Sequence, residues 1–311
     1  MATYKETKGT NIENFSSDPA NPVDGQVWYN TTSNALKVNK PITSAWATAN
    51  SMNTGRAYLS GAGIQTSALA FGGPPVNTES YNGTNWTEVN NLNTARLVGA
   101  GCGANNTAAL FAGGYDNAAS QVSSKTETWN GTNWTEVNDL NTARFSVAGN
   151  GISTAALVYG GQPSPKAQTE TWNGTNWTEV NDLNTARYNL AGAGTNTAAL
   201  AFGSTYETEL WNGTNWTEVN NLNTGRDSLA GAGTQTAALA FGGRPPPNSS
   251  ALTETWNGTN WTETADLNQA RHYLAGCGTN TAALTFGGSS TPNAATEEFS
   301  VGGGVATIST S

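Results

Sequence analysis

The stretch WNGTNWTEV occupies residues 172–180, and the same nine residues recur at 129–137 and 211–219. Two further copies differ by one residue, WNGTNWTET at 256–264 and YNGTNWTEV at 81–89. Threonine, tryptophan and valine favour β-strands, and Asn-Gly is the strongest short-range signal of a β-hairpin turn. Each copy is therefore expected to form the outer hairpin of a repeated β unit.

A second marker is a run that resembles LNTAR and always ends in arginine. Successive arginines are 40, 48, 43, 39 and 45 residues apart, with a mean of 43. They are Arg56, Arg96, Arg144, Arg187, Arg226 and Arg271. After each comes a run of small residues, such as LAGAGT at 190–195, and then an alternating segment, such as AALAF at 198–202. With the hairpin, this makes four short strands in each of six units, which predicts an all-β fold, a six-bladed β-propeller.

The sixth copy of the hairpin is divided between the two ends of the repeat region. The second tryptophan of each hairpin lies ten residues before an arginine, and Trp46 lies ten residues before Arg56. At the other end, TEEF at 296–299 matches TETW, but nothing five residues later, at Gly304, replaces the second tryptophan. We therefore expect the strand at Trp46 to complete the last blade and close the ring, which removes its open edges.

Composition narrows the class of protein. The chain has 311 residues, 36 glycines and 11 tryptophans, and only 11% of its residues are charged, which suits one large all-β domain. A formal net charge of −9 with 13 basic residues argues against a nucleic-acid partner, because a phosphate backbone needs a basic stripe. No segment reaches the roughly 18 apolar residues of a membrane span, so membrane insertion is not expected. The polar N-terminus lacks the apolar core of a secretion signal, so we expect the protein either to stay in the cytoplasm or to leave it by assembly or lysis.

Glycine pairs end the second predicted strand of most units. The pairs are Gly72-Gly73, Gly113-Gly114, Gly160-Gly161, Gly242-Gly243 and Gly287-Gly288, with Gly203-Ser204 in the fourth unit. Together with the aromatic residue of the third strand, the TN-x-W fourth strand and the junction arginine, this pattern resembles kelch repeats. The resemblance covers residues 46 to about 300 and implies a kelch-type propeller. It implies little about function, because such propellers serve as enzymes, adaptors and adhesins.

A glutamate precedes the aromatic residue of the third strand by two positions in every unit. These glutamates are Glu79, Glu127, Glu170, Glu209, Glu254 and Glu297. Six arginines and six glutamates in fixed register predict a repeated ion pair or a buried hydrogen-bond network. The alternative is an arginine cluster for sialic acid, as in six-bladed sialidases, although the Asp-box signature of those enzymes is absent.

Few residues suit catalysis. His272 is the only histidine, which argues against the copper enzymes of the kelch class, because these need several histidine ligands. We expect it to be structural or on the surface; the alternative is ligand contact at a blade junction. No nucleophile–histidine–acid set can be assembled, and Cys102 and Cys277 are expected to be small buried residues without a disulfide. We therefore expect no enzymatic activity, no cofactor and no metal site.

The strand order assigns the loops to two faces. Turns between first and second strands and between third and fourth strands share one face and repeat almost verbatim. Loops between second and third strands, together with the residues after each arginine, share the other face and differ among units. A constant frame with six different loops is typical of a binding surface, although loops that nothing constrains would also diverge. Because aromatic side chains suit sugar and protein contacts, the candidate binding residues are Tyr58, Tyr115, Tyr188, Tyr206, Arg244, His272 and Tyr273.

Residues 1–45 precede the predicted propeller domain, 46–311, and contain a short hairpin that needs a partner to be stable. Part of this segment resembles a stretch found in tail-fibre and structural proteins of bacteriophages. The matching residues are Gly25, Val27, Trp28, Tyr29, Asn30, Thr31, Thr32, Asn34, Leu36 and Lys37. The near-identical Thr/Asn/Gly-rich repeats also look like virion proteins of marine phages. This resemblance implies attachment to a virion, and we expect Trp28, Tyr29 and Leu36 to take part in it.

These observations favour a non-enzymatic virion protein of the tail-fibre or adhesin kind, made in the host cytoplasm and present in multiple copies on the particle surface. Residues 1–45 would dock on other virion proteins, and the propeller would bind a host surface glycan or protein. The alternatives are a purely structural fibre or decoration protein without receptor binding, a cellular kelch adaptor, and a glycan hydrolase.

Overall fold

The structure, a computed structural model, describes residues 12–289 and 294–308. All regular secondary structure in these residues is β-strand, as the sequence predicts. None of them forms a helix long and apolar enough to cross a membrane. The chain divides into two compact units, one made of Trp46–Ser300 and the other of Met1–Ala45 with Val301–Ser311.

The Trp46–Ser300 unit is built from repeated four-stranded antiparallel sheets whose strands pair in chain order. Five of these sheets lie wholly within the repeats. Their strands are β4 (Ser60–Ile64), β5 (Ser67–Phe71), β6 (Thr78–Tyr81) and β7 (Trp86–Val89); β9 (Ala100–Asn105), β10 (Ala108–Ala112), β13 (Thr126–Trp129) and β14 (Trp134–Val137); β15 (Ala148–Ile152), β16 (Ala155–Tyr159), β17 (Thr169–Trp172) and β18 (Trp177–Val180); β19 (Leu190–Gly194), β20 (Ala199–Gly203), β21 (Thr208–Trp211) and β22 (Trp216–Val219); and β23 (Ala230–Gly233), β24 (Ala238–Phe241), β25 (Thr253–Trp256) and β26 (Trp261–Glu263). Three short strands form a small separate sheet: β8 (Arg96–Leu97), β11 (Tyr115–Asp116) and β12 (Gln121–Val122).

A six-stranded sheet contains the remaining strands, in the order β27-β28-β29-β3-β2-β1. They are β27 (Ala275–Gly278), β28 (Ala282–Phe286), β29 (Thr296–Thr307), β3 (Ala35–Ala49), β2 (Val27–Asn30) and β1 (Glu13–Phe15). The first three correspond to the first three strands of the last repeat. Strand β3 carries Trp46 and occupies the position of the fourth strand, so the N-terminal side of the chain completes this sheet.

The repeat unit ends earlier than the predicted range of 46–311. Strand β29 does not stop after the TEEF segment but continues to Thr307 beside β3. Lys37 Nζ donates a hydrogen bond to Thr307 Oγ1 at 2.9 Å, and the Ile308 N–H donates to the Leu36 carbonyl at 2.8 Å. These bonds join the described residues after Ser300 to the N-terminal unit.

The repeated hairpins depend on both residues of each Asn-Gly pair. In the hairpin between β17 and β18, Asn173 Oδ1 accepts hydrogen bonds from the N–H groups of Thr175 and Asn176, at 2.9 and 2.8 Å. Gly174 has a φ of 92°, a conformation that residues with a Cβ rarely adopt. The asparagine side chain therefore fixes the turn, and the glycine allows the chain to reverse.

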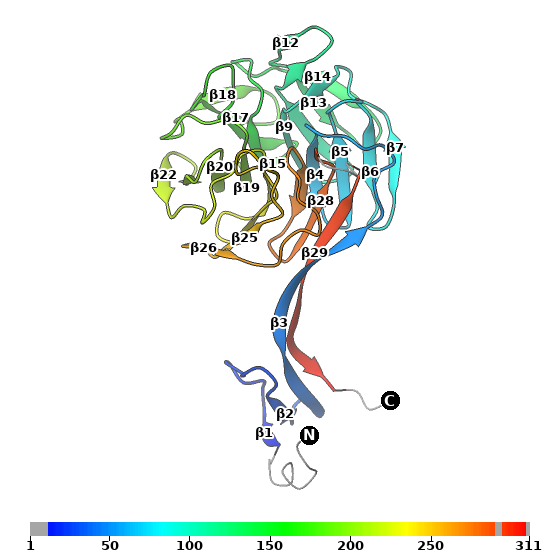
Figure 1. Ribbon diagram of the computed structural model, residues 1–311, viewed down its shortest axis with the longest axis vertical. Coiled ribbons are helices and arrows are strands. Elements are labelled where there is room, and N and C mark those ends of the chain that lie inside the picture. Colours follow the sequence, from blue (N-terminus) through cyan, green and yellow to red (C-terminus); the bar gives the residue numbers. More distant parts are fainter. Residues whose placement is uncertain (1–11, 290–293, 309–311) are drawn as a thin grey trace. The chain divides into compact units, whose positions relative to one another are not determined.

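The first strands of the five four-stranded sheets and of the six-stranded sheet contact one another in a closed cycle. Strand β4 contacts β9, and the contacts continue through β15, β19, β23 and β27 back to β4. Figure 1 shows the fourth strands β7, β18, β22 and β26 at the rim of this unit and the first strands β4, β9, β15 and β19 inside it. This arrangement is consistent with a β-propeller.

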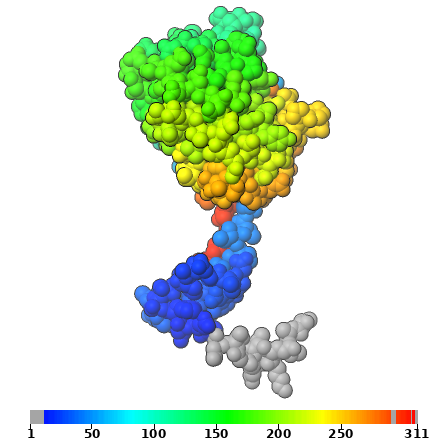
Figure 2. Space-filling view, turned by 90° about the vertical axis from the view of Figure 1, so that its left-hand side faces the viewer, coloured from blue at the N-terminus to red at the C-terminus, as the bar shows by residue number. Residues whose placement is uncertain are grey.

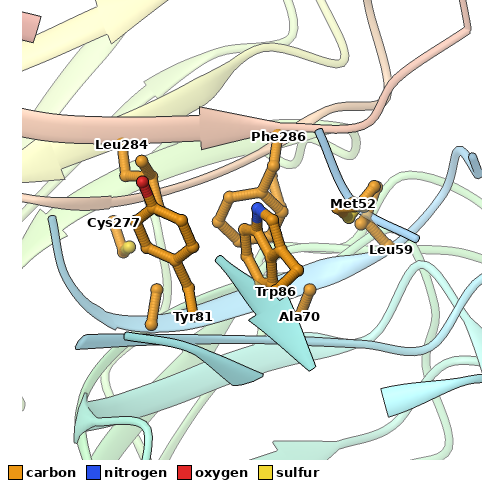
Figure 3. Packing of buried hydrophobic residues seen from close by; sticks show 10 residues of the cluster. Met52, Leu59, Ala70, Tyr81, Trp86, Cys277, Leu284 and Phe286 are labelled. Atoms are coloured by element: carbon orange, nitrogen blue, oxygen red, sulfur yellow. The ribbon is translucent and has the colours of Figure 1, made fainter. Parts of the chain in front are cut away.

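Small residues near the centre and aromatic residues farther out fill the space between neighbouring sheets. A Cβ added at Gly61 would lie 2.7 Å from the Phe286 ring, so the first strand has no room for a side chain there. Farther out, the Trp86 and Phe286 rings pack edge to face, with centroids 4.9 Å apart. Figure 3 shows both rings with Tyr81, Cys277 and their neighbours, between the first sheet and β28. This core joins the last repeat to the first.

The N-terminal unit contains the expected hairpin, β2 paired antiparallel with β3, and β1 adds to it in parallel. Trp28 is fully buried, and its Nε1 donates to Asp18 Oδ1 at 3.0 Å. Asn30 Nδ2 donates to the same oxygen at 2.8 Å. The hydrogen bonds from Asn30 and then Trp28 lower the pKa of Asp18 below its ordinary value, because they stabilise the carboxylate.

This burial changes the interpretation of the three predicted attachment residues. Trp28 has no exposed surface, so it stabilises the N-terminal unit and offers no contact to a partner. Tyr29 and Leu36 are half-buried and retain some exposed surface. Tryptophan has the largest apolar side chain, so in a sheet this small it packs against its own unit and leaves no surface for a partner.

Candidate binding face

Buried ion pairs fill the junctions between the sheets. Arg144 Nη2 lies 2.9 Å from Glu170 Oε1, and Arg144 Nη1 donates to the carbonyls of Gly160 and Gln168 at 3.0 and 2.6 Å. The equivalent pairs are Arg56–Glu79, Arg96–Glu127, Arg187–Glu209, Arg226–Glu254 and Arg271–Glu297. Burial lowers the pKa of all six arginines, and the paired glutamate opposes this effect.

None of the six arginine side chains is more than 2% exposed. Sialic acid could not reach them without opening the sheets, so the alternative of an arginine cluster for that sugar is wrong. The arginine–glutamate pairs belong to the frame of the molecule.

The glutamates also bind the neighbouring sheet along the chain. Glu170 Oε2 accepts hydrogen bonds from the Asn141 N–H and from Asn141 Nδ2, both at 2.8 Å. Asn141 Nδ2 also donates to the carbonyl of Trp177 at 3.2 Å. The same asparagine contact recurs at Asn53, Asn93, Asn184, Asn223 and Asn268. Each carboxylate therefore ties one repeat to the next.

A ring of backbone hydrogen bonds lies two residues after the arginines. The N–H of Val98 donates to the carbonyl of Tyr58 at 3.0 Å, and the N–H of Tyr58 donates to the carbonyl of Tyr273 at 3.1 Å. The remaining bonds run from Ser146 to Val98, Asn189 to Ser146, Ser228 to Asn189 and Tyr273 to Ser228. All six residues have φ between 50° and 61°, the left-handed region. The ring fixes the backbone of all six junctions against one another.

A pocket of about 520 Å³ opens beside this ring. It brings together five of the seven candidate residues, which come from different repeats: Tyr58, Tyr115, Tyr188, Arg244 and Tyr273. Tyr115 belongs to β11, in a long loop that stands out at the top of Figure 2 in aquamarine. Arg244 lies in the loop that connects β24 to β25. The loops of unequal length thus converge on the residues after the arginines.

Aromatic rings form two contacts in the wall of this pocket. The rings of Tyr58 and Tyr273 lie 4.2 Å apart between centroids, and those of Tyr115 and Phe145 lie 5.6 Å apart. The Arg244 guanidinium lies 6.0 Å from the centroid of the Tyr273 ring. These contacts hold the rings in place, since aromatic pairs attract each other at such distances.

Arg244 is paired within the protein. Its Nη2 lies 3.2 Å from Asp227 Oδ2, and the hydrogen bond to Asp227 raises the pKa of the guanidinium. The backbones of the same two residues pair as an isolated β-bridge. The positive charge at the pocket therefore has its counter-charge beside it.

The other two candidate residues lie apart from the pocket wall. Tyr206 is 55% exposed, and its ring lies against Gly225. His272 is held between two serines, with Ser249 Oγ 2.8 Å from Nδ1 and Ser289 Oγ 2.9 Å from Nε2. Burial, and then the charge of Arg244, lower the pKa of His272.

Seven residues of the pocket wall were not among the candidate binding residues: Leu97, Val98, Asn117, Phe145, Ser146, Gln162 and Asn189. Phe145 and Asn189 follow a repeat arginine by one and two positions, so the offset from the arginine was the signal that could have identified them. Asn117 and Gln162 lie in loops of unequal length and carry no such signal. Their positions emerge only from the folded chain.

The opposite turns form a second, uniform set of contacts. Asn138 Nδ2 donates to the carbonyl of Thr175 at 3.0 Å and to Asn176 Oδ1 at 2.8 Å, so it holds the hairpin of the next sheet. The equivalent donors are Asn50, Asn90, Asn181 and Asn220. The repeated asparagines therefore also hold each hairpin to the sheet before it.

Comparison with known proteins finds no family model that matches the sequence and no significant match among curated proteins. Among the described residues, no group of three or more histidine, cysteine, aspartate or glutamate side chains could hold a metal ion. Cys102 and Cys277 are free and buried, and burial raises the pKa of both thiols to about 12.

Proposed function

We propose that the five four-stranded sheets and the six-stranded sheet form the blades of a closed, six-bladed, kelch-type propeller. Strand β3 is the outer strand of the last blade. The closed cycle of first strands supports this, as does the ring of six backbone hydrogen bonds. The glycine pairs support the kelch type, because Gly160 and Gly161 both have positive φ and pack against neighbouring backbone and side chains. An experimental density map that resolves side chains would test the blade number, and any count other than six would overturn it.

We propose that the protein is a non-enzymatic binding protein displayed on the surface of a bacteriophage particle, where it attaches to a host surface glycan or protein. One observation carries the binding part. Buried pairs and uniform turns repeat throughout the frame, whereas one pocket gathers side chains that differ from repeat to repeat. A pocket with aromatic walls and a few polar groups is the usual form of a ligand site.

The N-terminal unit is proposed to dock on another protein of the particle. Seven of the eleven exposed large hydrophobic side chains among the described residues belong to this unit. They are Ile12, Val23, Val27, Ile42, Val301, Val305 and Ile308. Concentrated exposed apolar groups mark interaction sites, and a small sheet gains stability by covering them. The sequence resemblance of residues 25–37 to phage structural proteins supports the particle as the proposed partner.

Purified particles test this proposal. Mass spectrometry of particles freed of lysate proteins is expected to detect the chain, and antibodies against the Trp46–Ser300 unit are expected to label intact particles. Ile42→Ser changes a side chain that is 73% exposed, so it should reduce incorporation without unfolding the chain. Ile64→Ser, at an exposed position of the repeat unit, is the matched control. Particles that lack the chain would overturn the proposal.

Adsorption separates the proposed function from a purely structural role. Purified protein added before infection should compete with particles for the host surface. A decoration protein without receptor binding would leave adsorption unchanged at saturating concentrations.

A further inference from the structure

We infer that the tyrosine-lined pocket binds neutral sugar rings of a glycan. This inference rests on the proposed function, because it names the ligand class of the proposed binding site. It differs from that proposal in excluding a protein ligand and an acidic sugar.

The aromatic walls suit the faces of sugar rings. A pyranose ring presents C–H groups on its two faces and hydroxyl groups around its edge. The C–H faces pack on aromatic rings, whose faces carry partial negative charge. Tyr58, Tyr115, Tyr188 and Tyr273 supply rings from four different repeats around one cavity. Each also carries a hydroxyl that can donate or accept a hydrogen bond.

The polar groups of the pocket suit hydroxyl ligands. Asn117, Gln162 and Asn189 each offer an amide that both donates and accepts hydrogen bonds. A sugar hydroxyl also does both, so the two groups are complementary. Asn189 Nδ2 lies 3.5 Å from the hydroxyl of Tyr273, which places an amide at the edge of the aromatic wall.

The charges around the pocket favour a neutral sugar over an acidic one. Arg244 is the only cation of the pocket wall in the described part of the chain, and Asp227 already pairs with it at 3.2 Å. An acidic sugar would have to displace this carboxylate or lie near it. The net charge of −9 adds a further repulsion at low salt.

The size and rigidity of the pocket point to a small part of a ligand. A volume of about 520 Å³ lies within the range of sites that enclose a small molecule, whereas protein partners use broad, flatter surfaces. The hydrogen-bond ring fixes the backbone of Tyr58, Asn189 and Tyr273. A preformed wall reduces the ordering cost of binding, which matters for a weakly bound sugar.

Saturation-transfer NMR on the full chain tests the inference. The probes are maltotriose, lactose, mannobiose and chitobiose, with 3′-sialyllactose as the acidic counterpart of lactose. We expect saturation transfer to at least one neutral probe and none to 3′-sialyllactose. Tyr188→Ala should weaken binding of that probe at least tenfold. Tyr206→Ala removes an exposed tyrosine outside the pocket wall and should leave binding unchanged.

A second variant separates loss of binding from loss of fold. Tyr58→Phe removes only a hydroxyl, so it should keep the melting temperature and weaken binding severalfold. No transfer to any neutral probe, transfer to 3′-sialyllactose alone, or equal loss in Tyr206→Ala would each overturn the inference. If the purified protein blocks adsorption but binds no neutral sugar, the proposed function stands and the inference about the ligand fails. If the protein binds a neutral sugar but is missing from purified particles, the inference stands and the proposed function fails.

Discussion

The pair formed by Arg144 and Glu170 allows the strength of the frame to be measured. In Glu170→Ala, three hydrogen bonds to the carboxylate are lost, two from Asn141 and one from Arg144. The arginine then remains charged and buried, with a 0% exposed side chain. Removing one partner of a buried ion pair costs about 3–5 kcal/mol, because an uncompensated charge stays inside the protein. For a unit of this size, that corresponds to a fall in melting temperature of roughly 6–20 °C.

An exposed ion pair of this chain provides the matched control. Lys125 and Glu136 lie 3.0 Å apart, but their side chains are 40% and 49% exposed. Glu136→Ala should therefore cost about 0–1 kcal/mol and shift the melting temperature only slightly. Circular dichroism and calorimetry on both variants measure the two shifts, and Glu170→Gln isolates the effect of charge at nearly constant volume. A Glu170→Ala melting temperature within about 2 °C of the Glu136→Ala value would refute the reasoning.

Three further outcomes follow from the structure. Trp46 packs on two phenylalanine rings and donates to a buried threonine, so Trp46→Ala should cost about 3–5 kcal/mol on thermal unfolding, whereas the exposed Thr48→Ala should cost less than about 0.5 kcal/mol. Both cysteine thiols are buried with pKa values raised to about 12, so a thiol reagent at neutral pH should label them only after unfolding; prompt labelling of the folded protein would contradict this. In carboxyl-detected NMR, the Asp18 carboxyl should titrate with a pKa below its ordinary 3.8, and this pKa should rise in the Asn30→Ala variant. Because the folded value is depressed, the stability that this carboxylate contributes is present above pH 3.8 and is lost as the pH falls through the folded pKa.

The repeat made the frame predictable from the sequence. Residues that recur six times at one offset are expected at equivalent positions, which predicted a repeated contact between the arginines and glutamates; only the fold shows that these are buried ion pairs. The continuation of β29 was not predictable in this way, since VGGGVATIST after Ser300 matches no repeat. The hydrogen bond from the Trp28 indole to Asp18 was also not predictable, because no local sequence pattern identifies this partner.

The candidate site was predictable only in part. The varied residues after the arginines marked loops that converge in the fold, and five of seven candidates line one pocket. Tyr206 and His272 were chosen by the same rule but lie elsewhere, because a short loop and two serines hold them. The hydrogen-bond ring is formed by backbone atoms, so residue types do not reveal it: Val98 and Asn189 both belong to the ring.

The single exception among the repeats explains the asparagines of the uniform turns. At five junctions an asparagine holds the hairpin of the following sheet, as Asn220 does through Asn260 Oδ1 at 2.9 Å. The residue at the same position after β26 is Ala265, and the next sheet, the six-stranded one, has no Asn-Gly hairpin between β29 and β3. The asparagine side chain and the hairpin that it would hold are thus replaced together at this junction. The geometry of the turn alone would not require the two to change together, because the hydrogen bonds of a turn lie within one hairpin. The asparagines are therefore accounted for by contacts between sheets, which leaves the opposite loops free to differ.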